Sequence, residues 1–191
     1  SGAGKSTLVD VLLGLLEPTA GQVTVDGVDV AVDVRAWRAI VGYVPQTIHL
    51  CDDSIRRNVA FGVPDDRIDD AALSRSLRAA QLEDFVASLP EGMNTLVGEQ
   101  GVRLSGGQRQ RIGIARALYH DPAVLILDEA TSALDTATEK SVMRAVEALH
   151  GVKTLVIVAH RLTTVANCDT IYRLERGRVA TTGTFAEVFP A

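Results

Sequence analysis

The stretch "SGAGKSTLVDVLLGLL" (residues 1–16) joins a glycine-rich turn to the beginning of an apolar helix. Gly4, Lys5 and Ser6 fill the last three fixed places of the phosphate-binding pattern G-x-x-x-x-G-K-[ST]. By the same count, the first glycine of the pattern would lie two positions before Ser1. A match over so many consecutive positions predicts a P-loop, in which a turn between a strand and a helix holds the phosphates of a nucleotide.

The chemistry of this stretch supports the prediction. Glycines allow backbone N–H groups to curl around phosphate oxygens, and the helix expected from about Lys5 to Leu15 adds the positive end of its dipole. Lys5 would place a positive charge on the outer phosphates, and Ser6 would offer a hydroxyl to Mg²⁺. Taken alone, the stretch leaves one alternative, a Gly/Ser-rich turn that merely caps a helix.

Apolar strand-like segments alternate with helical patterns along the rest of the chain, which is typical of an α/β fold with a mostly parallel sheet. The strand-like segments are residues 21–30, 40–46, 123–127, 154–159 and 170–183. Residues 54 to about 89 are polar and helical in pattern, without a clear strand. We therefore predict a P-loop NTPase core formed by residues 1–50 and 120–191, with a helical subdomain inserted at 51–119.

Two kinds of strand are expected. The dipeptides Asp26-Gly27 and Arg176-Gly177 predict hairpin turns within the first and last of these segments. The runs 123–127 and 154–159 are continuously apolar, as expected for parallel strands that are buried on both faces.

Composition excludes several classes of protein. The chain has 191 residues, 47% of them hydrophobic and 23% charged, which is ordinary for a globular protein. Its net charge of −5 argues against a nucleic-acid-binding surface. Cys51 and Cys168 match no metal or redox spacing and are expected to be buried or half-buried. No apolar run approaches the roughly 20 residues that span a bilayer.

Two acidic residues, Asp128 and Glu129, follow the apolar run at 123–127. Successive side chains of a strand point to opposite sides, so we expect two separate roles for the pair. Asp128 would hold Mg²⁺, directly or through water, and Glu129 would orient or deprotonate a water that attacks the γ-phosphate. The alternative, an acidic cap on the next helix, is weakened by the P-loop upstream.

A second helix N-terminus that suits an anion is predicted at "RLSGGQRQRIGIARAL" (residues 103–118). Ser105 is a natural N-cap, and Gly106 and Gly107 leave the backbone amides bare. One nucleotide site does not need two such sites from the same chain. A helix end that faces the phosphate of a neighbouring subunit would explain it.

These motifs together resemble the nucleotide-binding domain of the ATP-binding cassette (ABC) transporter family. "LSGGQ" (104–108) resembles the family's signature, and "LILDEATSALD" (125–135) resembles its second carboxylate motif and D-loop. Gln46, at the end of "VGYVPQ", resembles the Q-loop glutamine, and His160, at the end of "TLVIVAH", resembles the switch histidine.

The resemblance implies a head-to-tail dimer of two cassettes, a homodimer or a heterodimer, that sandwiches two ATP molecules, each with Mg²⁺. It implies catalytic roles for Glu129, His160 and Gln46, and metal binding by Ser6, Gln46 and Asp128. It further implies nucleotide binding by Ser1, Gly2, Ala3, Gly4, Lys5, Ser6 and Thr7 and, towards the partner's nucleotide, by Ser105, Gly106, Gly107, Gln108 and Asp135. Asp135 also looks like the N-cap of the helix that follows it.

Three segments resemble the exporter branch of the family: residues 44–62, 96–101 with Glu99 at their acidic centre, and 158–184. In that branch the cassette powers a membrane domain, so a transmembrane partner and a place at the cytoplasmic face of a membrane are implied. Cys51 stands where the family often has a bulky residue. The alternative function is a soluble ABC-type ATPase, and the transported molecule stays open.

Because the chain begins within the P-loop pattern, we expect the strand that feeds this loop to precede Ser1. That strand is normally central in the sheet, so its loss is expected to leave a hydrophobic slot. We therefore expect these 191 residues alone to bind ATP poorly and to aggregate.

Overall fold

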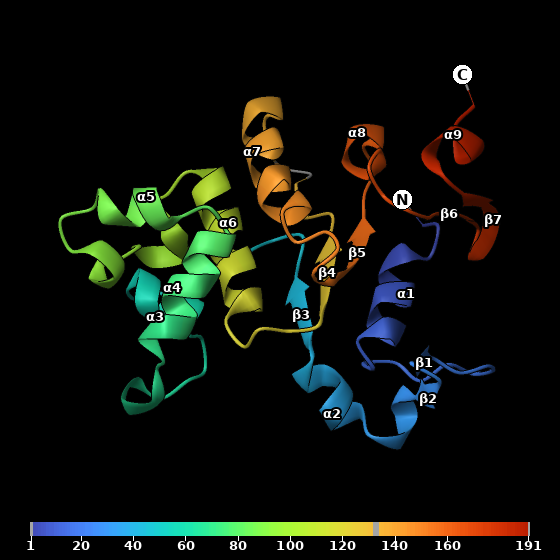
Figure 1. Cartoon of the computed structure of the whole chain (residues 1–191), viewed down its shortest axis with the longest axis horizontal. Helices are drawn as coiled ribbons and strands as arrows, with labels where there is room; N and C mark the ends of the chain where they lie inside the picture. Colours follow the sequence, from blue (N-terminus) through green and yellow to red (C-terminus); the bar gives the residue numbers. More distant parts are fainter. Residues whose placement is uncertain (1, 132–133, 191) are drawn as a thin grey trace.

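The computed structural model describes residues 2–131 and 134–190 and has the predicted α/β architecture (Figure 1). The strands are β1 (Thr24–Val25), β2 (Val28–Asp29), β3 (Val41–Val44), β4 (Val124–Asp128), β5 (Thr154–Val158), β6 (Ile171–Glu175) and β7 (Arg178–Gly183). The α-helices are α1 (Lys5–Leu12), α2 (Val34–Ala39), α3 (Ile55–Val59), α4 (Asp70–Ala79), α5 (Glu83–Ala87), α6 (Gly106–Leu118), α7 (Thr136–Glu147), α8 (Leu162–Val165) and α9 (Phe185–Val188). Short 3₁₀ helices occupy Val30–Val32, Asp65–Arg67, Gly92–Asn94 and Glu99–Gly101.

Strands β3, β4 and β5 form a parallel sheet in that order, and the sheet determines which chain segments lie together. Val44 pairs with Leu127, and Asp128 pairs with Val158, so the three strands end side by side. The segments that leave these strand ends therefore lie close together, although they are far apart in the sequence.

Strand β4 is buried on both faces, as predicted. Leu125 and Leu127 join a large core cluster that includes Ile112 of α6. Val124 and Ile126 join a second cluster with Val9 of α1. Helices α1 and α6 thus pack against opposite faces of the sheet, which Figure 1 shows as blue and yellow-green ribbons on either side of β4.

The predicted hairpins are confirmed. Asp26 and Gly27 between β1 and β2 have φ angles of 51° and 81°, and Arg176 and Gly177 between β6 and β7 have 50° and 75°. Two successive positive φ angles match the right-handed twist of a tight hairpin. The polar region after residue 54 forms α3, α4 and α5, as its helical pattern predicted.

Two details differ from the expectations. Helix α1 ends at Leu12 rather than near Leu15, because Gly14 adopts a left-handed conformation with φ of 65° that stops the helix. Strand β5 is only partly buried, because β4 covers one edge and the other side opens on a groove of about 1500 Å³ that β6 also lines.

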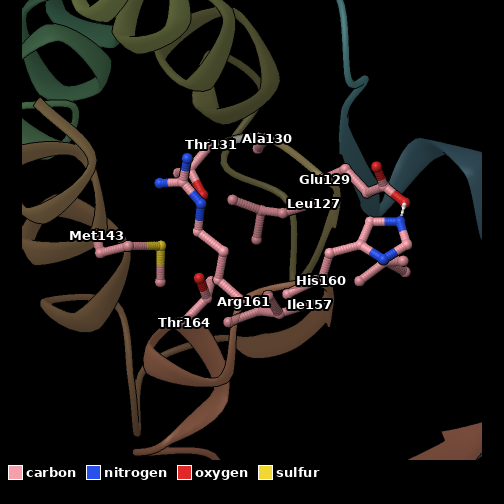
Figure 2. Close-up of a pocket in the computed structure, with 11 residues that line it drawn as sticks. Leu127, Glu129, Ala130, Thr131, Met143, Ile157, His160, Arg161 and Thr164 are labelled. Atoms are coloured by element: carbon pink, nitrogen blue, oxygen red, sulfur yellow. Dashed lines mark ion pairs between the residues drawn. The ribbon is translucent and has the colours of Figure 1, made fainter. Parts of the chain in front are cut away.

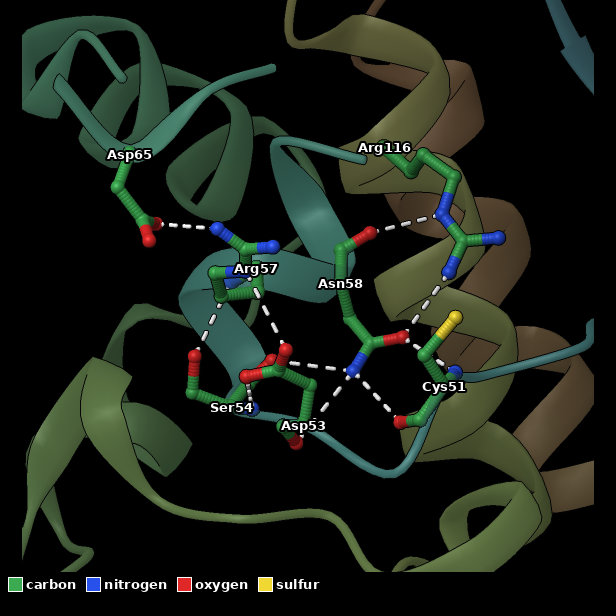
Figure 3. A network of polar contacts seen from close by, with 7 residues as sticks. All are labelled: Cys51, Asp53, Ser54, Arg57, Asn58, Asp65 and Arg116. Atoms are coloured by element: carbon green, nitrogen blue, oxygen red, sulfur yellow. Dashed lines mark hydrogen bonds and ion pairs between the residues drawn. The ribbon is translucent and has the colours of Figure 1, made fainter. Parts of the chain in front are cut away.

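Cys51 is exposed rather than buried, whereas Cys168 is half-buried as expected. The backbone of Cys51 is bound by the buried Asn58, whose side chain accepts a hydrogen bond from Cys51 N at 2.9 Å and donates one to Cys51 O at 3.0 Å. Arg116 donates to Asn58 in turn (Figure 3). These bonds fix the backbone of Cys51 while its side chain reaches solvent. Among the residues described, no helix is long and apolar enough to cross a membrane.

Candidate functional site

The Glu129 carboxylate lies at the centre of a polar cluster at the ends of the parallel strands. Gln46 Nε2 donates to Glu129 Oε2 at 3.1 Å. His160 Nε2 lies 2.5 Å from Glu129 Oε1, as Figure 2 shows. Lys5 Nζ is 3.9 Å from the same oxygen and 3.4 Å from His160 Nε2. Four side chains that sequence motifs singled out separately are thus brought together from α1 and from the three strand ends.

The backbone at Glu129 differs from the predicted strand geometry. Strand β4 ends at Asp128, and Glu129 follows in a left-handed conformation with φ of 49°. Its N–H donates to Val158 O at 2.9 Å, which holds the turn against β5. The two carboxylates are therefore separated by a left-handed turn and not by strand alternation, and such a conformation costs energy that the surrounding contacts must offset.

Asp128 has a neighbour that the sequence motifs missed, Tyr43 of β3. Burial raises the pKa of Asp128, nearby Glu129 raises it further, and a hydrogen bond with Tyr43 opposes the rise. The pKa of Tyr43 is raised by burial and by Asp128. A phenol in an otherwise apolar strand was the available signal, since β3 pairs directly with β4.

The same surroundings suit a divalent cation. A carboxylate whose charged form is disfavoured by burial and by a second carboxylate is stabilised by a nearby cation. The hydroxyl of Ser6 lies in the first turn of α1, which packs on β4. Among the described residues, no group of three or more His, Cys, Asp or Glu side chains could hold a metal by itself. Mg²⁺ is usually held by one or two carboxylates together with phosphates and water.

The phosphate loop has the backbone that its glycines allow. Gly2 and Gly4 have φ angles of 85° and 91°, and Gly4 is the N-cap residue of α1. Ala3 O accepts a hydrogen bond from Gly177 N at 3.0 Å, so the β6–β7 turn supports the loop. Thr7 follows in the first turn of α1, whereas Ser1 lies outside the described residues.

Ser105 caps α6 as predicted and forms a reciprocal pair with Gln108. Gln108 N donates to Ser105 Oγ at 3.2 Å, and Ser105 N donates to Gln108 Oε1 at 2.7 Å. Gly107 is buried, and a Cβ atom at this position would lie closer than 3.0 Å to Thr138 Cγ2 of α7. Gly107 therefore has a packing role that its motif did not reveal, because only glycine lets α6 approach α7 this closely.

The predicted site residues form two groups. Lys5, Gln46, Asp128, Glu129 and His160 lie at the strand ends, where α1 begins. The second group lies where α6 meets α7: Asp135 Oδ1 accepts from Thr138 N at 3.1 Å as the cap of α7, and Leu134 packs beside Gly106. Helices α1 and α6, whose N-termini belong to these two groups, pack against opposite faces of the sheet.

Comparisons with known proteins agree on one family. The model of the ABC transporter family matches residues 1–132. The "ATP-dependent lipid A-core flippase" of Cupriavidus pinatubonensis is 46% identical over 100% of this chain and 33% of its own length. The "ABC transporter ATM1" of Toxoplasma gondii is 41% identical over 98% of this chain and 16% of its own length.

A solved structure, described as "Structure of a bacterial Atm1-family ABC exporter with ATP bound", is 42% identical and superimposes with a TM-score of 0.87. That match covers 98% of this chain and 33% of the solved chain. The chain thus spans about a third or less of the length of these relatives.

Proposed function

Because the chain belongs to the ABC transporter family, we propose that it is the ATP-binding and ATP-hydrolysing cassette of an exporter or flippase. In this proposal two cassettes close around two ATP molecules, and hydrolysis lets them reopen. The membrane domain that moves the substrate is a partner outside these residues, and the cassette works at the cytoplasmic face of the membrane. The proposal keeps the division into a core (1–50 and 120–191) and a helical subdomain (51–119).

The observation that carries the proposal is the shared carboxylate of Glu129, with Gln46 on one oxygen and His160 on the other. A carboxylate held in this way can accept a proton from, or orient, a water that attacks a phosphoryl group. Lys5, which lies beside both Glu129 and His160, is in reach to neutralise charge on the outer phosphates.

Mg²⁺ would be held by Ser6, Asp128 and Gln46, in addition to phosphate oxygens. When bound, it would neutralise charge that develops on the transferred phosphoryl group. Asp128 supplies the negative charge of the donor set, and Tyr43 holds its carboxylate by a hydrogen bond. The amide of Gln46 would then link the metal to Glu129.

A second subunit would complete each ATP site. Helix α6 has 13 residues, and its N-terminus suits an anion. This end is formed by the N-cap Ser105 and by Gly106, Gly107 and Gln108. We propose that this end contacts the γ-phosphate held by the phosphate loop of the other cassette, with Asp135 beside it. Two-fold symmetry then makes two equal sites, because each chain gives the same two surfaces.

The test is steady-state ATP hydrolysis by the purified full-length protein and two variants. Glu129→Gln removes the charge but keeps the shape, and it should lower kcat by about 10²–10⁴-fold while ATP still binds. Lys5→Ala should weaken ATP binding itself. Hydrolysis by Glu129→Gln at the wild-type rate would contradict the proposal.

A further inference from the structure

A buried carboxylate lies next to the proposed hydrolysis site and has no role in it so far. Glu139, in the first turn of α7, is 5% exposed. Its Oε1 accepts from Thr131 Oγ1 at 3.1 Å and from Thr164 Oγ1 at 3.0 Å, and its Oε2 forms an ion pair with Arg161. Glu139 thus holds side chains from the loop after β4 and from the loop after β5 with the short helix α8 that follows it.

These loops are the ones that carry Glu129 and His160. Thr131 follows Glu129 by two positions, and Arg161 directly follows His160. The backbone of Arg161 is extended, with φ −96° and ψ 129°, so the side chains of His160 and Arg161 leave the loop in different directions. Figure 2 shows His160 turned towards Glu129, while Arg161 points to the side of the pocket where Thr131 and Thr164 lie.

The same cluster reaches the start of α7. Arg161 Nη2 donates to Leu134 O at 3.2 Å, and Glu139 N donates to Asp135 O at 2.8 Å. A movement of the segment around Asp135 would therefore pull on Arg161 and, through the backbone, on His160. Because Asp135 belongs to the surface proposed to face the second cassette, the cluster connects that surface with the hydrolysis site.

Charge strengthens this connection. Burial raises the pKa of Glu139, but the hydrogen bonds from Arg161, Thr164 and Thr131 outweigh it, so the pKa lies below its usual value. Glu139 is therefore ionised at neutral pH. Separating Glu139 from Arg161 would leave an ionised carboxylate buried without its cationic partner, which costs free energy. The loops that carry the two partners are therefore expected to move together rather than to break this contact.

We propose that Glu139, paired with Arg161, is a positioning residue for ATP hydrolysis that holds His160 against Glu129 and couples this contact to the start of α7. The inference rests on the proposed function. Glu139 touches neither nucleotide nor water in this role. It acts by fixing the relative position of the loops after β4 and β5, and a misplacement of about 1 Å at a reacting centre can cost about 10²-fold in rate.

The test compares two variants with a matched control in the full-length protein. Glu139→Gln keeps the shape and one acceptor oxygen for the threonines, but it loses the charge and the second acceptor oxygen that binds Arg161. Arg161→Lys keeps the charge but cannot bridge Glu139 and Leu134 with one planar group. Each should lower kcat by about 10- to 100-fold with KM for ATP within about 2-fold, since positioning and not binding is lost. Glu147→Gln is the control, because Glu147 lies on the same helix and binds Asn167, away from the site.

The double variant should be no slower than the slower single variant, because both changes break one contact. A purely structural role would instead lower the melting temperature and leave kcat unchanged below it, which would overturn the proposal. If Glu139→Gln does not fold, Arg161→Lys decides alone, since the side chain of Arg161 is 41% exposed. An inactive Glu129→Gln beside fully active Glu139→Gln and Arg161→Lys refutes the positioning role only, whereas an active Glu129→Gln refutes the proposed function.

Discussion

Gly107→Ala separates packing from phosphate binding in the α6 N-terminus. The added methyl group would lie inside 3.0 Å of Thr138 Cγ2, and Thr138 is β-branched and has few alternative rotamers. Overpacking of this kind costs about 1–3 kcal/mol, and better helix propensity returns about 0.5–1 kcal/mol. We expect a net loss of about 1–2 kcal/mol, or roughly 2–8 °C in melting temperature at about 2–4 °C per kcal/mol.

Gly106→Ala is the matched control, since its methyl group would meet the flexible end of Leu134 at 3.3 Å and should change stability by less than about 0.5 kcal/mol. Thr138→Ser should rescue Gly107→Ala, because it removes Cγ2 and leaves the next atom, Thr138 Cβ, at 3.7 Å. The assay is thermal unfolding of the full-length protein, followed at the cassette transition. Unchanged melting of Gly107→Ala, or no rescue by Thr138→Ser, would refute the packing role.

Three further outcomes are expected. Ser105→Arg should leave ATP affinity within about 3-fold but abolish hydrolysis, because it blocks closure of the second subunit on the phosphate; normal turnover in an ATPase assay would contradict this. Leu125→Ala should lower the free energy of unfolding by about 2–5 kcal/mol in denaturant titrations, since Leu125 is fully buried in β4, and a loss below 1 kcal/mol would show that the core can collapse around it. Because the pKa of Glu139 is lowered in the folded protein, the ionised carboxylate contributes its full stabilisation above the ordinary pKa of about 4.3, and this contribution disappears as pH falls through the lowered pKa. The difference in free energy of unfolding between wild type and Glu139→Gln should therefore vanish in acid. A difference that does not depend on pH would contradict this.

Short sequence motifs predicted the hairpins and helix caps, because these features depend on contacts between residues that are close together in the sequence. The hairpins at Asp26-Gly27 and Arg176-Gly177, and the caps Ser105 and Asp135, depend on residues within a few positions of each other. The convergence of Lys5, Gln46, Glu129 and His160 was also predictable, because parallel strands deliver their end residues to one edge.

The remaining features depend on contacts between distant residues. Glu139 meets Arg161 across 22 positions, and Tyr43 meets Asp128 across the β3–β4 pairing, so neither partner is visible from its own motif. The buried Asn58 binds the backbone of Cys51, a contact that the sequence motifs did not indicate. The close approach of α6 to α7 at Gly107 likewise follows from packing, which periodicity alone does not describe.

The central claim is that each ATP site is built from two chains, and the structure of full-length Glu129→Gln with Mg²⁺ and ATP tests it most directly. The account predicts that Ser105 Oγ and the Gly107 N–H of one chain lie within about 3 Å of the γ-phosphate that Lys5 of the other chain holds. Gln46 and residue 129 should face the position of the attacking water in the same site. A γ-phosphate enclosed by residues of a single chain, with Ser105 of the second chain out of contact, would contradict the account.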